Sequence, residues 1–102
     1  MAKSETTIEQ SMVRECRKHG GRAFKFIPIG FSGIPDRIVI LPFVPIFFVE
    51  VKRVGGEASP LQRVMHAWLR SLGQEVYVLD SLDDFRLVIQ SKLKQSLLKQ
   101  ES

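Results

Sequence analysis

The sequence predicts a mixed α/β protein in which helices flank a small sheet, with its elements in the order αβββαβα. Helical stripes of apolar residues open the chain and recur in its second half, whereas β-branched and aromatic runs fill its middle. Turns containing glycine or proline separate these segments. The chain has 102 residues, 44% of them hydrophobic and 25% charged, so we expect one domain over residues 1–102 with a single modest core.

The first helix is expected over residues 4–19, where Ile8, Met12 and Cys16 recur at four-residue intervals. Two consecutive glycines end this helix. Alternation of polar and apolar residues then predicts a first strand over residues 22–29, with a proline near its end.

Two β-branched and aromatic runs, residues 36–41 and 46–52, predict an antiparallel hairpin closed by a proline-containing turn. A turn centred between residues 43 and 44 places Asp36 opposite Val51. This register brings the start of one strand beside the end of the other.

A helix, a strand and a second helix are expected in the second half of the chain. Ser59 is a suitable N-cap, and residues 75–79 form a short apolar run typical of a strand. Ser81 then caps the final helix. The middle helix is expected to bury six apolar residues on one face: Leu61, Val64, Met65, Trp68, Leu69 and Leu72.

Three ionisable residues interrupt the apolar hairpin. Alternation along a strand places Glu50 and Lys52 on the same face, and the pairing brings Asp36 to the same end of the sheet. Two carboxylates are oxygen ligands suited to Mg²⁺, and a neighbouring ammonium group stabilises charge that develops on a phosphate. The pattern therefore predicts a site for phosphodiester hydrolysis. The simpler alternative is a solvated Lys–Glu ion pair with Asp36 as a turn cap.

The spacing of several motifs is more specific than any one of them. Gly33-Ile-Pro-Asp36-Arg is followed by Phe48-Val-Glu50-Val-Lys52-Arg, Ser59-Pro-Leu-Gln62 and LGQEVYVLDS. This series resembles the PD-(D/E)XK nuclease superfamily, and within it the small stand-alone phage and bacterial members of the VRR-NUC family. The resemblance covers nearly the whole chain. It implies a restriction-endonuclease-like core and an endonuclease that depends on a divalent metal ion.

The resemblance also implies roles for individual residues. Asp36 and Glu50 match the acids that bind Mg²⁺ or Mn²⁺ in this family, with the Val51 carbonyl as a further ligand. Lys52 matches the catalytic lysine.

Two further positions match the family at the site. Glu9 matches an acid of the first helix that faces the metal, with Glu5 as the competing choice. Gln62 matches a glutamine that helps to shape the site, although it also stands three residues after Ser59, where it would complete a capping box.

Other reactive or aromatic side chains have structural interpretations. His19 is expected at a helix end and His66 on a helix surface, because neither is followed four residues later by a metal-ligating residue. Cys16 and Trp68 are expected in the core. Three lysines are expected on a solvated face of the last helix: Lys92, Lys94 and Lys99.

The net charge of +4 favours an anionic partner such as DNA. Cys16 is the only cysteine, so a disulfide within the chain and a CxxC zinc cluster are both excluded. No apolar run has the length of a membrane span, and the polar N-terminal segment is unlike a signal peptide. We therefore expect a cytoplasmic, intracellular protein.

The resemblance further implies a structure-selective enzyme that acts on branched DNA. Small members of the family are similar to Holliday-junction resolvases that act as homodimers on four-way junctions. The hairpin turn, residues 41–47, has an apolar sequence where the family usually has polar residues, so this turn or the flanking helix is expected to contact a second subunit. The alternative function is a nonenzymatic module that binds branched DNA or a partner nuclease.

Overall fold

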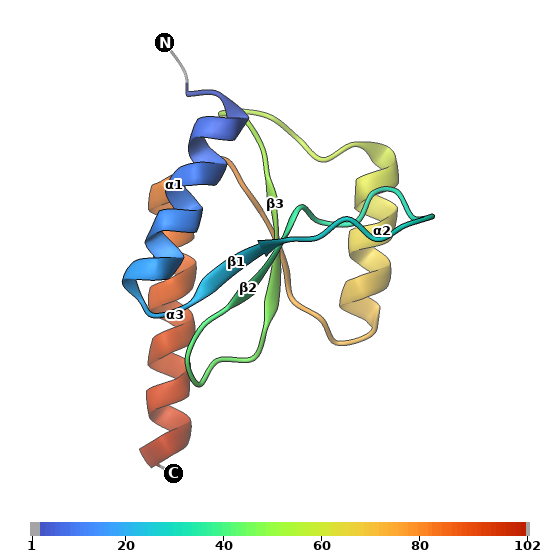
Figure 1. Cartoon of the computed structure of the whole chain (residues 1–102). Coiled ribbons are helices and arrows are strands. Elements are labelled where there is room, and N and C mark those ends of the chain that lie inside the picture. Colours follow the sequence, from blue (N-terminus) through green and yellow to red (C-terminus); the bar gives the residue numbers. More distant parts are fainter. Residues whose placement is uncertain (1–2, 102) are drawn as a thin grey trace.

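The computed structural model describes residues 3–101 and contains a four-stranded sheet flanked by helices (Figure 1). The spatial order is β1-β2-β3-β4, with antiparallel pairing from β1 to β3 and parallel pairing between β3 and β4. This architecture confirms the predicted α/β class and element order. The elements are α1 (Glu5–Lys18), β1 (Arg22–Lys25), β2 (Arg37–Ile40), β3 (Phe47–Val51), α2 (Pro60–Ser71), β4 (Val76–Leu79) and α3 (Leu82–Glu101).

The two faces of the sheet have different neighbours: α1 and α3 lie on one side and α2 on the other (Figure 1). The α1/α3 side holds the larger core, because alternate residues of β3 meet the apolar stripes of both helices. Its cluster includes Ile8, Met12, Cys16, Val39, Phe47, Val49, Val51, Phe85 and Ile89. The α2 side has a much smaller buried cluster, Phe48, Leu69 and Val76. Most of the apolar core therefore lies between the sheet and the α1/α3 pair.

The pairing of β2 with β3 differs by one residue from the predicted register. Arg37 pairs with Val49, so the position just before β2, that of Asp36, corresponds to Glu50 and not to Val51. Residues that face each other in an antiparallel pair point to the same side of the sheet. The observed register therefore places both carboxylates on the α2 side.

The turn between these strands explains the shift in register. The Val44 N–H donates to the Leu41 carbonyl at 3.3 Å, and Phe43 has a φ of +61°. The turn is thus centred on a residue in the left-handed region, which a non-glycine side chain rarely adopts. A turn centred on one residue, rather than between two, changes the pairing by one position.

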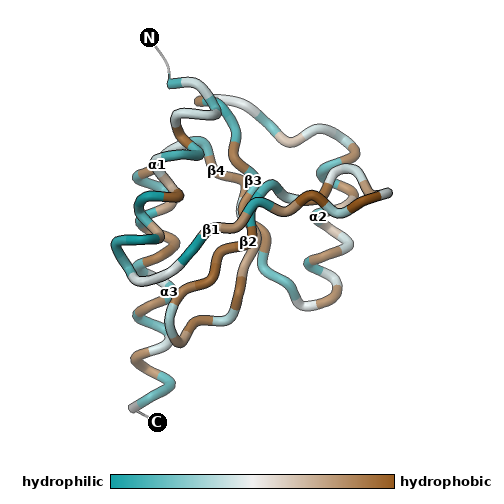
Figure 2. Tube along the Cα trace, viewed as in Figure 1, coloured by the Kyte–Doolittle hydropathy of each residue, from teal (hydrophilic) through white to brown (hydrophobic). Residues whose placement is uncertain are grey.

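The first strand is shorter than predicted and ends at Lys25. The Phe26 N–H still donates to the Asp36 carbonyl at 2.8 Å. Pro28 has no N–H, so the ladder cannot continue through that position. The remaining β1–β2 connection runs beside α2, where Figure 2 shows it largely as a hydrophobic segment. It exposes three large apolar side chains: Ile27, Ile29 and Phe31.

Helix α2 buries fewer apolar residues than predicted. His66 and Leu69 are the buried residues within this helix. The expectation that Trp68 belongs to the core is wrong, since its side chain is 51% exposed. The helix turns a mixed polar and apolar face to the sheet, and this leaves an exposed row of Leu61, Val64, Trp68 and Leu72. Across residues 3–101, none of the helices has both the length and the apolar character needed to span a membrane.

Two phenylalanines allow a direct test of where the core lies. Phe85 is fully buried between α3 and the sheet, whereas Phe43 is 83% exposed at the hairpin turn. We expect Phe85→Ala to lower the free energy of unfolding by about 3–5 kcal/mol, because it leaves a cavity. Phe43→Ala is expected to change it by less than about 0.5 kcal/mol. Urea denaturation followed by circular dichroism measures both values, and equal effects would contradict this placement of the core.

Candidate active site

Three ionisable side chains meet at the C-terminal end of β3, as the hairpin pattern predicted. Lys52 Nζ lies 3.6 Å from Glu50 Oε2, and Asp36 Oδ2 accepts a hydrogen bond of 3.1 Å from the Val51 N–H. Glu50 is 1% exposed, so it is not part of a solvated surface ion pair. That simpler interpretation of the Lys–Glu pair is therefore wrong.

Asp36 is fixed through both its backbone and its side chain. Its carbonyl accepts the Phe26 N–H from the end of β1, and its carboxylate accepts the Val51 N–H from β3. In an extended strand the N–H and C=O of one residue point to the same edge. The Val51 carbonyl is therefore directed to the edge of β3 on which Asp36 lies.

Burial and the neighbouring carboxyl group dominate the electrostatics of Glu50. Burial, followed by a hydrogen bond to Asp36 and the negative charge of Asp36, raises the pKa of Glu50 to about 8. The Lys52 ammonium opposes this shift. A cation placed between the two carboxylates would relieve their repulsion and favour the charged form of Glu50.

His66 is a member of this site that the sequence interpretation placed on the helix surface. It is 1% exposed and faces β3, with Nε2 at 3.8 Å from Glu50 Oε1. Burial, followed by the positive charges of Arg70 and Lys52, lowers the pKa of His66. One feature of the sequence could have placed His66 at the site. It stands four residues after Gln62 and therefore lies on the same side of α2. His19, in contrast, is the C-cap of α1 as predicted.

Gln62 completes the capping box of α2. Its Oε1 accepts a hydrogen bond of 2.8 Å from the Ser59 N–H, and its own N–H donates to Ser59 Oγ at 3.2 Å. The capping interpretation is confirmed. The cap fixes the start of the helix that carries His66 to the site.

Glu9 lies on the other side of the sheet from the two paired carboxylates. Arg37 Nε donates to Glu9 Oε2 at 2.6 Å, and Arg37 also donates to the Ala23 carbonyl at 3.1 Å. Because Arg37 pairs with Val49, its side chain is on the α1/α3 face. The structure thus couples Glu9 to Arg37 and does not bring it beside Glu50. The competing candidate, Glu5, is exposed in the first turn of α1.

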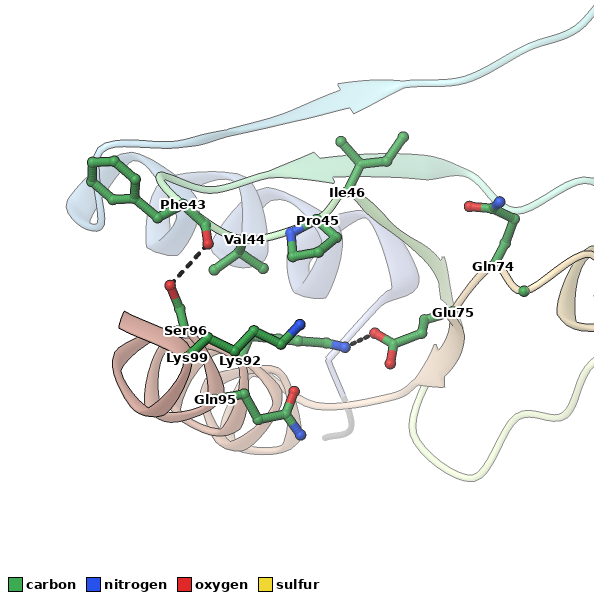
Figure 3. Close-up of a pocket in the computed structure, with 11 residues that line it drawn as sticks. Phe43, Val44, Pro45, Ile46, Gln74, Glu75, Lys92, Gln95, Ser96 and Lys99 are labelled. Carbon is green, nitrogen blue, oxygen red and sulfur yellow. Dashed lines mark hydrogen bonds and ion pairs between the residues drawn. The ribbon is translucent and has the colours of Figure 1, made fainter. Parts of the chain in front are cut away.

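A hollow of about 250 Å³ lies at the opposite end of β3, between the hairpin turn and α3 (Figure 3). Lys92 enters it and forms an ion pair with Glu75 (Figure 3). The prediction that Lys92 is solvated is wrong, since it is 7% exposed and its ammonium lies over the rings of Phe47 and Tyr77. The contacts of its ammonium group with the two rings and with Glu75 attach α3 to the sheet. Lys94 is exposed as predicted.

The fold and this constellation define a class: an α/β nuclease-type domain with two acids and a lysine at the end of a central hairpin. A solved structure described as "VRR_NUC domain" superposes with a TM-score of 0.77 and 29% identity, over 86% of this chain and 97% of the other. The protein named "Putative nuclease p44" from Acyrthosiphon pisum secondary endosymbiont phage 1 is 49% identical over 79 residues, which cover 78% of this chain and 85% of the relative. No protein-family model matches the chain. On these comparisons, the chain belongs to the VRR-NUC family.

The raised pKa of Glu50 predicts a specific dependence of stability on pH. Its pKa rises from 4.5 to about 8, so the folded state binds a proton that the unfolded state has lost. This stability is fully present below pH 4.5 and is lost as the pH rises toward 8, by up to about 1.4 kcal/mol per pH unit. We expect Glu50→Gln to flatten this decline in buffer containing EDTA, as measured by urea denaturation between pH 6.5 and 8.5. An unchanged slope in the variant would show that Glu50 does not cause it.

Proposed function

We propose that the protein is a divalent-cation-dependent DNA endonuclease that hydrolyses phosphodiester bonds. The observation that supports this most strongly is the meeting of Asp36, Glu50 and Lys52 at one end of β3. Membership of the VRR-NUC family and the name of the phage relative agree with it. We take residues 1–102 as one nuclease domain.

The donor atoms at this site fit a hard divalent cation. Glu50 is buried, and the Asp36 carboxyl group destabilises its charged form. Within residues 3–101, no three His, Cys, Asp or Glu side chains form a complete metal cage. Mg²⁺ does not need such a cage, because it is commonly held by one or two carboxylates together with water and substrate phosphate. Asp36, Glu50 and the Val51 carbonyl would hold Mg²⁺ or Mn²⁺.

The chain's own residues would divide the chemistry among them. A bound divalent cation supplies a Lewis acid that polarises the scissile phosphate. Lys52 places its ammonium group where it can orient an attacking water and stabilise charge that develops on the phosphate. Gln62 would shape the site by fixing the start of α2, and Glu9 would support it from the other face by holding Arg37, the neighbour of Asp36.

Cleavage of DNA tests these roles directly. We expect metal-dependent cutting of labelled DNA in Mg²⁺ or Mn²⁺ and none in EDTA. Lys52→Ala and Asp36→Asn should each lower the rate about 10²-fold or more, because each removes a group that acts in the transition state. Lys94→Ala is the matched control, since Lys94 is an exposed lysine far along α3.

The same assay separates the two functional classes and tests the proposed substrate. We propose that four-way junctions are cut in preference to duplex or single-stranded DNA of equal sequence. Binding of a junction without cutting in any divalent ion would favour the nonenzymatic module. Equal metal-dependent cutting by wild type, Lys52→Ala and Asp36→Asn would contradict the assigned residues.

We further propose that the protein acts as a homodimer and that the exposed face of α2 forms the interface. Four residues lie within roughly a quarter of the helix circumference at 3.6 residues per turn: Leu61, Val64, Trp68 and Leu72. The β1–β2 connection packs beside them, because Gly33 lies against Leu61 and Met65. Ile27, Ile29 and Phe31 of that connection are exposed as well, so the apolar face extends beyond the helix. A second copy presents the same face, so a two-fold axis would cover both.

The hairpin turn provides less uncovered surface than its sequence suggested. Val44 is buried, and Ser96 Oγ of α3 donates to the Phe43 carbonyl at 2.8 Å. The exposed apolar residues of this turn are Phe43, Ile46 and the two prolines, Pro42 and Pro45. The turn is therefore the second candidate for the contact between subunits.

Trp68 is the only tryptophan and reports on this interface. We expect its emission to shift to shorter wavelength as the protein concentration rises through the dimerisation range, because the ring leaves water. Light scattering should give twice 11.6 kDa for wild type and for Phe43→Ser, and 11.6 kDa for Trp68→Glu. A monomeric mass for Phe43→Ser, with Trp68→Glu still dimeric, would place the interface at the hairpin turn. A monomeric wild type at all concentrations would contradict the dimer.

A further inference from the structure

Two buried polar atoms without a hydrogen-bond partner face each other between β3 and α2. Among residues 3–101, Glu50 Oε1 and His66 Nε2 are the buried side-chain atoms left unsatisfied. They lie 3.8 Å apart. An unsatisfied buried donor or acceptor costs about 1–3 kcal/mol, so a pair of them at one site indicates a function in another state of the molecule.

The separation of these atoms limits what can join them. A bridging water would hold its two partners about 4.5 Å apart, because it makes two hydrogen bonds of about 2.8 Å at a near-tetrahedral angle. A direct hydrogen bond requires about 2.7–3.2 Å, so a side-chain movement of less than about 1 Å is enough. Hydrogen bonds at catalytic sites are often long before substrate or cofactor is bound.

We propose that His66 is a positioning residue, which donates a hydrogen bond from Nε2 to Glu50 Oε1 when the divalent cation binds. This bond would hold one oxygen of the carboxylate against α2. The other oxygen, Oε2, is the one that faces Lys52 at 3.6 Å, and it would be left for the cation. The inference rests on the proposed function, because it concerns the same site.

The surroundings of His66 support this role. It extends from a helix whose start is fixed by the capping box of Ser59 and Gln62, so the ring approaches β3 from a rigid element. Residues that orient a metal-binding carboxylate typically contribute 10- to 100-fold to metal affinity. The imidazole would then hold Oε1, while Oε2, which faces the Lys52 ammonium group in the absence of a cation, stays available to the cation.

The test measures Mn²⁺ binding in the absence of DNA, by electron paramagnetic resonance of the free ion. His66→Leu fills the same space but cannot donate, whereas His66→Gln retains an N–H donor. We expect His66→Leu to weaken Mn²⁺ binding by about 10- to 100-fold and His66→Gln to recover most of that loss. His19→Gln is the matched control, because His19 pairs with Glu15 at the far end of α1, and it should bind Mn²⁺ as wild type does.

Thermal unfolding of each variant, followed by circular dichroism, shows that the variants compared are folded. Wild-type affinity in folded His66→Leu would overturn the positioning role and leave the proposed nuclease intact. Equal weakening in folded His66→Leu and His66→Gln would also overturn it, because ring packing and not hydrogen-bond donation would then be responsible. If wild type itself failed to bind Mn²⁺, both the proposed function and this inference would fall.

Discussion

The burial of Glu50 is the constraint on which the rest of the site depends. All five residues of β3 are buried, and Glu50 is the charged one among them. A carboxylate removed from water must be neutralised, paired or bound to a metal ion. Lys52 gives partial compensation at 3.6 Å, while Asp36 acts against it. Without a cation, a bound proton neutralises Glu50, as its pKa of about 8 indicates, and we propose that a divalent cation takes the place of this proton and satisfies both carboxylates.

The two faces of the sheet have different roles: one carries most of the apolar core, and the other carries the candidate site. On the α1/α3 side, β3 contributes Phe47, Val49 and Val51 to the large core. On the α2 side the same strand contributes Glu50, and the apolar cluster there is small. If the register of the hairpin slipped by one residue, side chains that now face the core would face the opposite side of the sheet, since side chains alternate along a strand. The position of Phe43 at the centre of the turn is thus linked to the position of the two acids.

Much of the site could be predicted from the sequence because it depends on the period of a strand and on one turn. Glu50 and Lys52 share a face in any extended segment, and the hairpin brings Asp36 close to them. The exact partner of Asp36 could not be predicted, because it depends on the left-handed φ of Phe43, and nothing in the residue type requires that conformation.

The residues that were misplaced lie on helices, where burial depends on how the helix is rotated about its axis. The apolar stripe of α2 predicts that Trp68 faces the sheet, yet the sheet side holds His66, whose Nε2 lies 3.8 Å from Glu50 Oε1. The rarity of buried lysines favours a solvated Lys92, but Glu75 and two aromatic rings accommodate its ammonium group. The pairing of Glu9 with Arg37 could not be predicted either, because the two residues are 28 positions apart and local sequence patterns do not report such contacts.

Whether Asp36 and Glu50 share a cation can be tested with crystals soaked in Mn²⁺, with data collected at a wavelength where manganese scatters anomalously. We expect an anomalous peak within about 2.0–2.3 Å of one oxygen from Asp36 and one from Glu50. Manganese bound elsewhere, or the two carboxylates turned away from each other around an ion-free gap, would contradict it.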